Sequence, residues 1–464
     1  MPNAIVIGGS LAGMCAARVL SDFVDSVTVI ERDSYPANRD FRTGVPQARH
    51  LHNLLARGLR EYEAFFPGFE QKMLDAGAVP VESGWDIATR LPHGWAQRGH
   101  TGLWQLYASR PLIEATVRQL CQRLGNVTFL ERTEVTGLRV AGVGERHRYC
   151  SGVEVRSRDD GAMRALAASL VVDASGAHSR AAEWLRQRGL ESPEDEIVDG
   201  LTGYSSRWFR QKDWPSEWWW KVLFLRMMTP ENPYLVAFCP TEDQRWVLSY
   251  VGVNKQYPPS REDEFAAALS TLVSPVVREM VRHMEPISPI YSSRATQNRW
   301  RHYERLRRPL GGFVAIADAA CSYNPRFAQG MSTAAVCARI LERCLLELGV
   351  ADLRLPERFF SAQARFQTTP WLFAAGDDLR FPATGGKRSW SVQVYNWYRL
   401  NAVRCTDKRV GARLAEVTQL VKPRSSLFAP EVASSVAITT IRRHFAQLAR
   451  RSTKSIALMP PGVG

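Results

Sequence analysis

A short glycine-rich segment near the N-terminus has the residue types and spacing of a phosphate-binding turn. It reads Gly8-Gly9-Ser10-Leu11-Ala12-Gly13 and follows the apolar run AIVI, which predicts a buried strand. Gly8 would permit the tight turn from strand to helix, and Gly13 would let the helix pack closely on the strand. Ser10 stands where a small residue must let the backbone approach a pyrophosphate. The helix that follows would offer free N–H groups and a positive dipole end to the phosphates.

An acidic residue supports a nucleotide site at this turn. The run SVTVIE predicts a second strand that ends at Glu31, 18 residues beyond Gly13. At this spacing a carboxylate accepts hydrogen bonds from an adenosine ribose. The same carboxylate would repel a 2′-phosphate, so we expect the turn not to hold NADP. A strand–helix turn without a ligand is the alternative, and Glu31 argues against it.

Two later segments indicate which nucleotide binds. One reads VVDASGAHSR (171–180) and the other FVAIADAACSYNPRFAQGMSTAA (313–335). In this order after the glycine turn, they resemble the FAD-dependent monooxygenases of the para-hydroxybenzoate hydroxylase fold. That single-component group includes aromatic hydroxylases and squalene-type and polyether epoxidases, and the resemblance covers at least residues 1–340. It implies an α/β fold, in which a Rossmann-like FAD-binding domain carries an inserted, mostly antiparallel substrate sheet and a helical C-terminal region.

The resemblance assigns roles at the N-terminal end of the site. The glycine turn would hold the FAD pyrophosphate, and Glu31 would hold the adenosine ribose. Arg110, at the start of RPLIEATVRQL, resembles the arginine that opens a helix beside the FAD phosphates. Arg42 and Gly44 resemble residues of the loop that passes the isoalloxazine ring. For either arginine, a surface salt bridge is the structural alternative.

The later segments supply the flavin end of the site by the same resemblance. Asp173, with Ser179 and Arg180, matches a motif that lies between FAD and the nicotinamide nucleotide. Asp318 would contact the ribityl chain. The loop Asn324–Met331 resembles the family's NPxxGQGM loop, whose backbone N–H groups would face the flavin pyrimidine edge. Alanine stands where the family usually has glycine at three positions, which are Ala174, Ala317 and Ala328.

These roles define a set of predicted cofactor residues. The predicted FAD-binding residues are Gly8, Ser10, Leu11, Ala12, Gly13, Glu31, Arg32, Arg42, Gly44, Arg110, Val135, Asp173, Ala174, Asp318, Pro325, Ala328, Gln329, Gly330 and Met331. Arg42, Pro325 and Gly330 are the candidates beside the flavin ring, and no side-chain acid or base is assigned. The predicted reductant is NADPH or NADH, which would bind transiently because no second Rossmann turn is found.

The pattern of elements divides the 464 residues into three parts. The FAD-binding domain is expected from residues 1–85, 105–200 and 300–350, with NVTFLE, TEVTGLRV and GVEVRSRD as the strands of a meander. The substrate sheet is expected from residues 86–104 and 201–299. Residues 351–464 follow a helical pattern.

The tryptophan-rich insert and the absence of an obvious carboxylate-binding cluster together indicate a bulky, apolar substrate. The candidate pocket residues are Trp218, Trp220, Phe224 and Phe327. For any single tryptophan, ordinary packing in the core or on the face of a sheet is the favoured alternative. The resemblance implies that FAD, NAD(P)H and O₂ hydroxylate or epoxidise this substrate through a C4a-hydroperoxyflavin. A flavin-dependent dehydrogenase or reductase on the same fold is the first alternative, and a non-catalytic flavin-fold binding protein is the second. A halogenase is disfavoured because the WxWxIP motif is absent, and Lys221 reads as a strand residue at a solvent edge.

Composition excludes several other classes. The eight cysteines form no CxxC pair, which favours reduced thiols in a cytoplasmic protein. His50 and His52 have no third metal ligand nearby in the sequence, so no metal is expected. The net charge of +14 is spread along the chain without a nucleic-acid-binding signature, so we expect no nucleic-acid partner. The basic segment from Ile441 to Lys454 is interpreted as a solvated helix face, with weak membrane contact as the alternative. The oligomeric state stays open.

Overall fold

A parallel sheet forms the centre of the N-terminal half. The computed structural model describes residues 2–42, 44–142, 148–294, 297–448 and 457–462. The sheet order is β21-β12-β1-β2-β8, and every neighbouring pair is parallel. Its strands are β1 (Asn3–Ile7), β2 (Ser26–Ile30), β8 (Val127–Leu130), β12 (Leu170–Asp173) and β21 (Phe313–Ala315). Their apolar runs are buried because both faces of a parallel sheet are covered.

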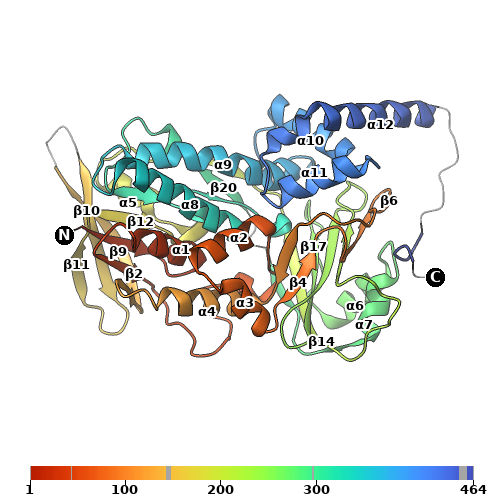
Figure 1. The fold of residues 1–464 in the computed structure, drawn as a ribbon, viewed down its shortest axis with the longest axis horizontal. Helices are drawn as coiled ribbons and strands as arrows, with labels where there is room; N and C mark the ends of the chain where they lie inside the picture. The colour runs from red at the N-terminus through yellow and green to blue at the C-terminus, as the bar shows by residue number, and fades with distance from the viewer. Residues whose placement is uncertain (1, 43, 143–147, 295–296, 449–456, 463–464) are drawn as a thin grey trace.

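The prediction that NVTFLE is a meander strand is wrong. This segment forms β8, which pairs in parallel with β2, with Val27 opposite Val127. The physical reason is the preceding helix α4 (Arg110–Cys121), which supplies the crossover that a parallel strand needs. The meander itself is β9 (Thr133–Ala141), β10 (Tyr149–Ser157) and β11 (Met163–Ala167), which lie at the left of Figure 1.

Helices and short strands enclose the parallel sheet. The helix α1 (Leu11–Leu20) packs against α4, α2 (Ala56–Phe65) and α8 (Gly330–Leu348), and α8 packs in turn on α9 (Leu355–Asp378) (Figure 1). Two shorter helices are α3 (Phe69–Asp75) and α5 (Ala181–Gln187). One three-stranded sheet contains β3 (Asn53–Leu54), β7 (Trp104–Tyr107) and β4 (Val79–Glu82). Another contains β13 (Asp195–Val198), β20 (Asn298–Arg301) and β22 (Cys321–Ser322).

The second half of the molecule is built on an eight-stranded sheet. Its members are β18 (Met284–Pro286), β14 (Gly203–Gln211), β17 (Arg245–Gly252), β16 (Tyr234–Pro240), β15 (Val222–Arg226), β5 (Ile87–Leu91), β6 (Gly94–Trp95) and β19 (Tyr291–Ser293). All pairs are antiparallel except β15 with β5, which brings residues 87–95 into the same sheet as residues 203–293. Two helices, α6 (Glu262–Ser270) and α7 (Val276–Arg282), contribute to the core packed on this sheet.

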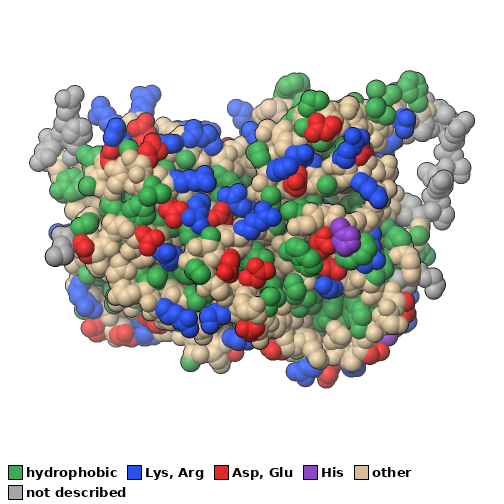
Figure 2. Space-filling model, viewed as in Figure 1, with side chains coloured by type: hydrophobic (Ala, Val, Ile, Leu, Met, Phe, Trp, Pro, Cys, Tyr) green, Lys and Arg blue, Asp and Glu red, His purple; other side chains and the backbone are tan. Residues whose placement is uncertain are grey.

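Three helices lie at the upper right of Figure 1: α10 (Trp390–Val403), α11 (Lys408–Thr418) and α12 (Pro430–Leu448). Figure 2 shows hydrophobic side chains over this region, where Trp390 and Phe445 are exposed, and it shows basic and acidic side chains intermixed across this face. The basic segment Ile441–Lys454 lies partly in α12, and residues 449–454 lie outside the described residues. Among the described helices, none combines the length and the hydropathy that crossing a bilayer requires.

Candidate functional site

One cavity of about 1190 Å³ connects the two sheets and the C-terminal helices. Its walls come from the glycine turn after β1, the loop before α8, the inner face of the eight-stranded sheet, and α9 to α11. The predicted site residues that line it are Gly8, Ser10, Leu11, Ala12, Glu31, Arg32, Arg42, Gly44, Arg110, Val135, Ala174, Asp318, Pro325, Ala328, Gly330, Met331, Phe224 and Phe327. Segments more than 300 residues apart in sequence thus meet around one space.

Close backbone packing within the protein requires glycine at two positions of the glycine turn. Gly8 has φ +95°, and a Cβ atom there would lie 2.7 Å from the carbonyl oxygen of Ala174. A Cβ atom at Gly13 would collide with the Gly8 carbonyl, so Gly13 sets the packing of α1 on β1 rather than contacting a ligand. Ser10 is the N-cap residue of α1. Arg110 donates from Nη2 to the Ser10 hydroxyl at 2.8 Å, which places a guanidinium at the helix N-terminus.

A buried chain of charges links the turn to the loop at Arg42. Glu31 accepts a hydrogen bond from the Gly9 amide at 3.0 Å, and its carboxylate lies 3.1 Å from Arg42 Nη1. Glu114 lies 2.7 Å from Arg42 Nη2 and 3.2 Å from Arg110 Nε. Burial lowers the pKa of Arg42, but the carboxylates of Glu114 and Glu31 outweigh it and raise the pKa overall. The buried Nε of Arg42 has no hydrogen-bond partner among the described residues, which fits a site for a polar cofactor.

Asp173 lies behind the cavity wall. Its side chain is fully buried and accepts hydrogen bonds from Ser179 Oγ and from the amide and hydroxyl of Ser175. Burial raises the pKa of this carboxyl, and the serine hydrogen bonds oppose the rise. Asp173 therefore shapes the turn that presents Ala174 and Arg180 to the cavity.

The flavin-loop segments contain two alanines in a left-handed conformation. Ala317 and Ala328, which stand where the resemblance implies glycine, both have φ 53°. Between them, Asp318 lines the cavity, and burial raises its pKa to about 6 while Arg110 and Arg301 oppose the rise. The helix α8 begins at Gly330, as predicted, and its first residues border the cavity. The neighbouring Gln329 instead faces away and donates to the Thr418 carbonyl at 3.0 Å.

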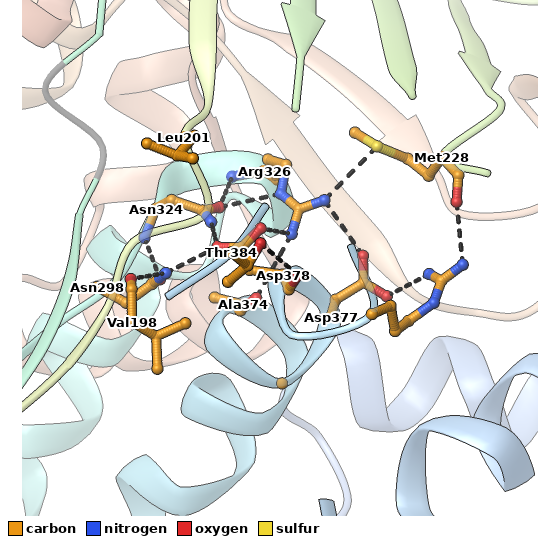
Figure 3. A network of polar contacts seen from close by, with 12 residues as sticks. Val198, Leu201, Met228, Asn298, Asn324, Arg326, Ala374, Asp377, Asp378 and Thr384 are labelled. Carbon is orange, nitrogen blue, oxygen red and sulfur yellow. Dashed lines mark hydrogen bonds and ion pairs between the residues drawn. The ribbon is translucent and has the colours of Figure 1, made fainter. Parts of the chain in front are cut away.

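A buried ionic network, which the sequence did not indicate, fixes the loop before α8 (Figure 3). Arg326 is paired with Asp378 and lies 3.2 Å from Asp377. Asp378 also accepts from the amides of Asn298 at 2.7 Å and Asn324 at 2.5 Å. Since both aspartates end α9, this network holds the flavin loop to the C-terminal helical region.

The prediction that Trp218 and Trp220 form the pocket is wrong. Both side chains are buried in the core between the eight-stranded sheet and α6 and α7, where their rings stack at 5.3 Å. The reason is that their segment packs on the sheet face away from the cavity. Phe224 and Phe327 do line the cavity.

Several arginines that were not among the predicted site residues also line the cavity, and two of them are Arg226 and Arg399. Arg226 lies two residues after Phe224 in β15, so strand alternation places both on one face. Arg399 lies on the buried side of α10 with Tyr395 and Ala402, at helical spacing. In both β15 and α10, an arginine stands at a position where the periodicity of the element predicts a buried side chain. This signal in the sequence could have identified Arg226 and Arg399.

The histidine pair also borders the cavity. His50 Nδ1 lies 2.8 Å from Ser206 Oγ, and burial lowers the pKa of His50 to about 4 and that of His52 to about 3. Both imidazoles are therefore neutral at neutral pH. Within the described part of the chain, no group of three His, Cys, Asp or Glu side chains is arranged to hold a metal ion.

The fold and the glycine turn define a flavoprotein of the para-hydroxybenzoate hydroxylase type. The family model described as FAD binding domain matches residues 2–348, so the chain belongs to this family and is a FAD-dependent oxidoreductase. Protein Rv3254 of Mycobacterium tuberculosis is 36% identical over 390 residues, which cover 82% of this chain and 80% of that protein.

Solved structures share the fold at low identity. A flavin-dependent brominase, Bmp2, superposes with a TM-score of 0.63 at 14% identity, over 96% of this chain and 99% of its own. The tetrameric 2-methyl-3-hydroxypyridine-5-carboxylic acid oxygenase superposes with a TM-score of 0.61 at 15% identity, over 91% and 98%. Because oxygenases and halogenases share this architecture, the fold alone does not determine the reaction.

Proposed function

We propose that this protein is a monooxygenase that uses FAD, NADH or NADPH, and O₂ to hydroxylate or epoxidise a bulky, largely apolar substrate. The observation that carries the proposal is the continuity of the cavity. The glycine turn, the Pro325 loop and the apolar side chains of Phe224 and Leu235 border one space. A cofactor held at the turn and loop would therefore face a substrate held against the sheet.

The chain's own groups would bind, orient and shield the reactants. The N-terminus of α1 and Arg110 would hold the FAD phosphates, and Glu31 would hold the adenosine ribose. The N-terminus of α8 would favour negative charge on the flavin pyrimidine edge. When bound and reduced, the flavin supplies the activation of O₂. The α9–α11 helices border the cavity and would limit the access of water to the reacting atoms.

Oxygen incorporation tests the proposal. The FAD-loaded protein is reduced with NADPH or NADH under anaerobic conditions, exposed to ¹⁸O₂ with candidate polyenes and aromatic compounds, and the products are analysed by mass spectrometry. We expect one labelled oxygen atom per product molecule. Products that carry bromine or chlorine in the presence of halide, without the label, would establish halogenation instead. A purified protein that takes up no FAD would support the binding-protein alternative.

A further inference from the structure

Four arginines and two aspartates meet where β15, the loop before α8, and the α9–α10 region converge. Asp377 lies 2.7 Å from Arg380 Nη1, is paired with Arg399, and lies 3.2 Å from Arg326. Asp378 forms an ion pair with Arg326 and accepts hydrogen bonds from the side-chain amides of two asparagines. The fourth arginine, Arg226, completes the cluster. Four cations against two anions leave two net positive charges.

Arg226 is the arginine of this cluster that has no paired carboxylate in the part of the chain that the structure describes. Its guanidinium has no hydrogen bond or carboxylate within ion-pair distance among the described residues, and the side chain borders the cavity. Its carbon Cζ lies 4.4 Å from the centroid of the Phe327 ring, which offers only a cation–π contact. Burial lowers the pKa of Arg226 to about 10; the nearby carboxylate of Asp377 opposes this fall, and Arg399 and Arg326 add to it, so Arg226 remains protonated at neutral pH. A partly buried cation without a paired carboxylate is costly unless an anion joins it.

The neighbouring groups indicate where such an anion would sit. Arg326 and Arg399 also lie 5.9 and 5.8 Å from the Phe327 ring, so three guanidinium groups surround one aromatic side chain. Arg399 Nε is buried without a hydrogen-bond partner among the described residues. The acidic residues that border the cavity are Glu31, Asp33, Glu134 and Asp318, none of which belongs to this cluster.

We propose that Arg226 and Arg399 form a subsite for a carboxylate group on the substrate, whose apolar body packs against Phe224, Phe373 and Leu414. This inference rests on the proposed function and refines its substrate class from apolar to apolar with one anionic group. The cofactor phosphates would lie elsewhere, at the turn between β1 and α1, whereas Arg226 and Arg399 come from β15 and α10. Phe327 lies two residues after Pro325, so a substrate anchored there would border the flavin loop.

Binding without turnover tests this subsite independently of oxygen transfer. FAD-loaded protein is titrated by calorimetry, without NADPH, with 2-naphthoate and with 2-naphthamide, which has the same rings and no charge. We expect the carboxylate to bind about 10- to 100-fold more tightly, as a charge-assisted contact to a partly buried guanidinium predicts. Arg226→Met should remove this preference and leave the amide affinity unchanged. Arg226→Gln serves the same purpose if the methionine variant does not fold.

The matched control is Arg210→Met, an exposed arginine of β14 in the same sheet, which should keep the full preference. Equal affinity for the two compounds, absence of binding of both, or a preference that survives the loss of Arg226 would overturn the subsite. Failure of ¹⁸O incorporation with an intact carboxylate preference would instead refute the monooxygenase alone.

Discussion

Replacing Ala328 with glycine should stabilise the protein, although the same change destabilises most helices and strands. Ala328 has φ 53° and is partly exposed at the end of the loop before α8. A left-handed conformation costs an L-residue roughly 1–2 kcal/mol. Glycine relieves that cost but makes the unfolded chain more flexible by about 0.4–1 kcal/mol, and it loses part of a methyl contact. The expected net gain is about 0.5 kcal/mol.

Two companion substitutions separate backbone strain from other effects. Ala317 has the same φ but is 1% exposed, so the loss of a fully buried methyl, about 0.8 kcal/mol, should bring Ala317→Gly close to neutral. Ala437 is exposed in the helix α12, where glycine should cost about 1 kcal/mol. Urea unfolding of the FAD-loaded proteins should rank the variants with A328G above A317G and A437G lowest. If A328G is destabilised as much as A437G, the reasoning from φ is refuted.

Three further predictions concern charged groups. Glu31→Gln should weaken FAD binding about tenfold in a fluorescence titration, because the carboxylate pairs with Arg42 and would hold the ribose; an unchanged affinity would remove Glu31 from the site. Asp378→Asn should cost about 3 kcal/mol of unfolding free energy because it weakens a buried pair. Asp159, the exposed partner of Arg132, should tolerate Asp159→Asn without a measurable change. Since burial raises the pKa of Asp318 to about 6, the FAD-free native state keeps a proton that the unfolded chain releases near pH 4. Stability should therefore fall as the pH rises from about 4 to 6, and Asp318→Asn should flatten this fall in urea midpoints; an equal fall in the variant would contradict it.

The local sequence was sufficient where function depends on short-range backbone geometry. The glycine turn, Glu31 and the start of α8 at Gly330 are set within a few residues by strand, turn and helix signals. Strand alternation could likewise have placed Arg226 beside Phe224. The same local rules could not assign β8, because whether a strand pairs with β2 or with β9 depends on the path of the chain between them.

The chemistry of the substrate end was decided only by the tertiary structure. Trp218 and Trp220 have the composition of a pocket, but the side of the sheet on which they pack places them in the core. Arg226, Arg326, Asp377 and Arg399 are spread over more than 170 residues and look unremarkable one by one. Their combined charge exists only where the sheet, the flavin loop and the C-terminal helices converge, because electrostatic interactions depend on distance and burial rather than on position in the chain. The sequence thus determined the cofactor-binding fold, while tertiary packing determined which charges face the cavity.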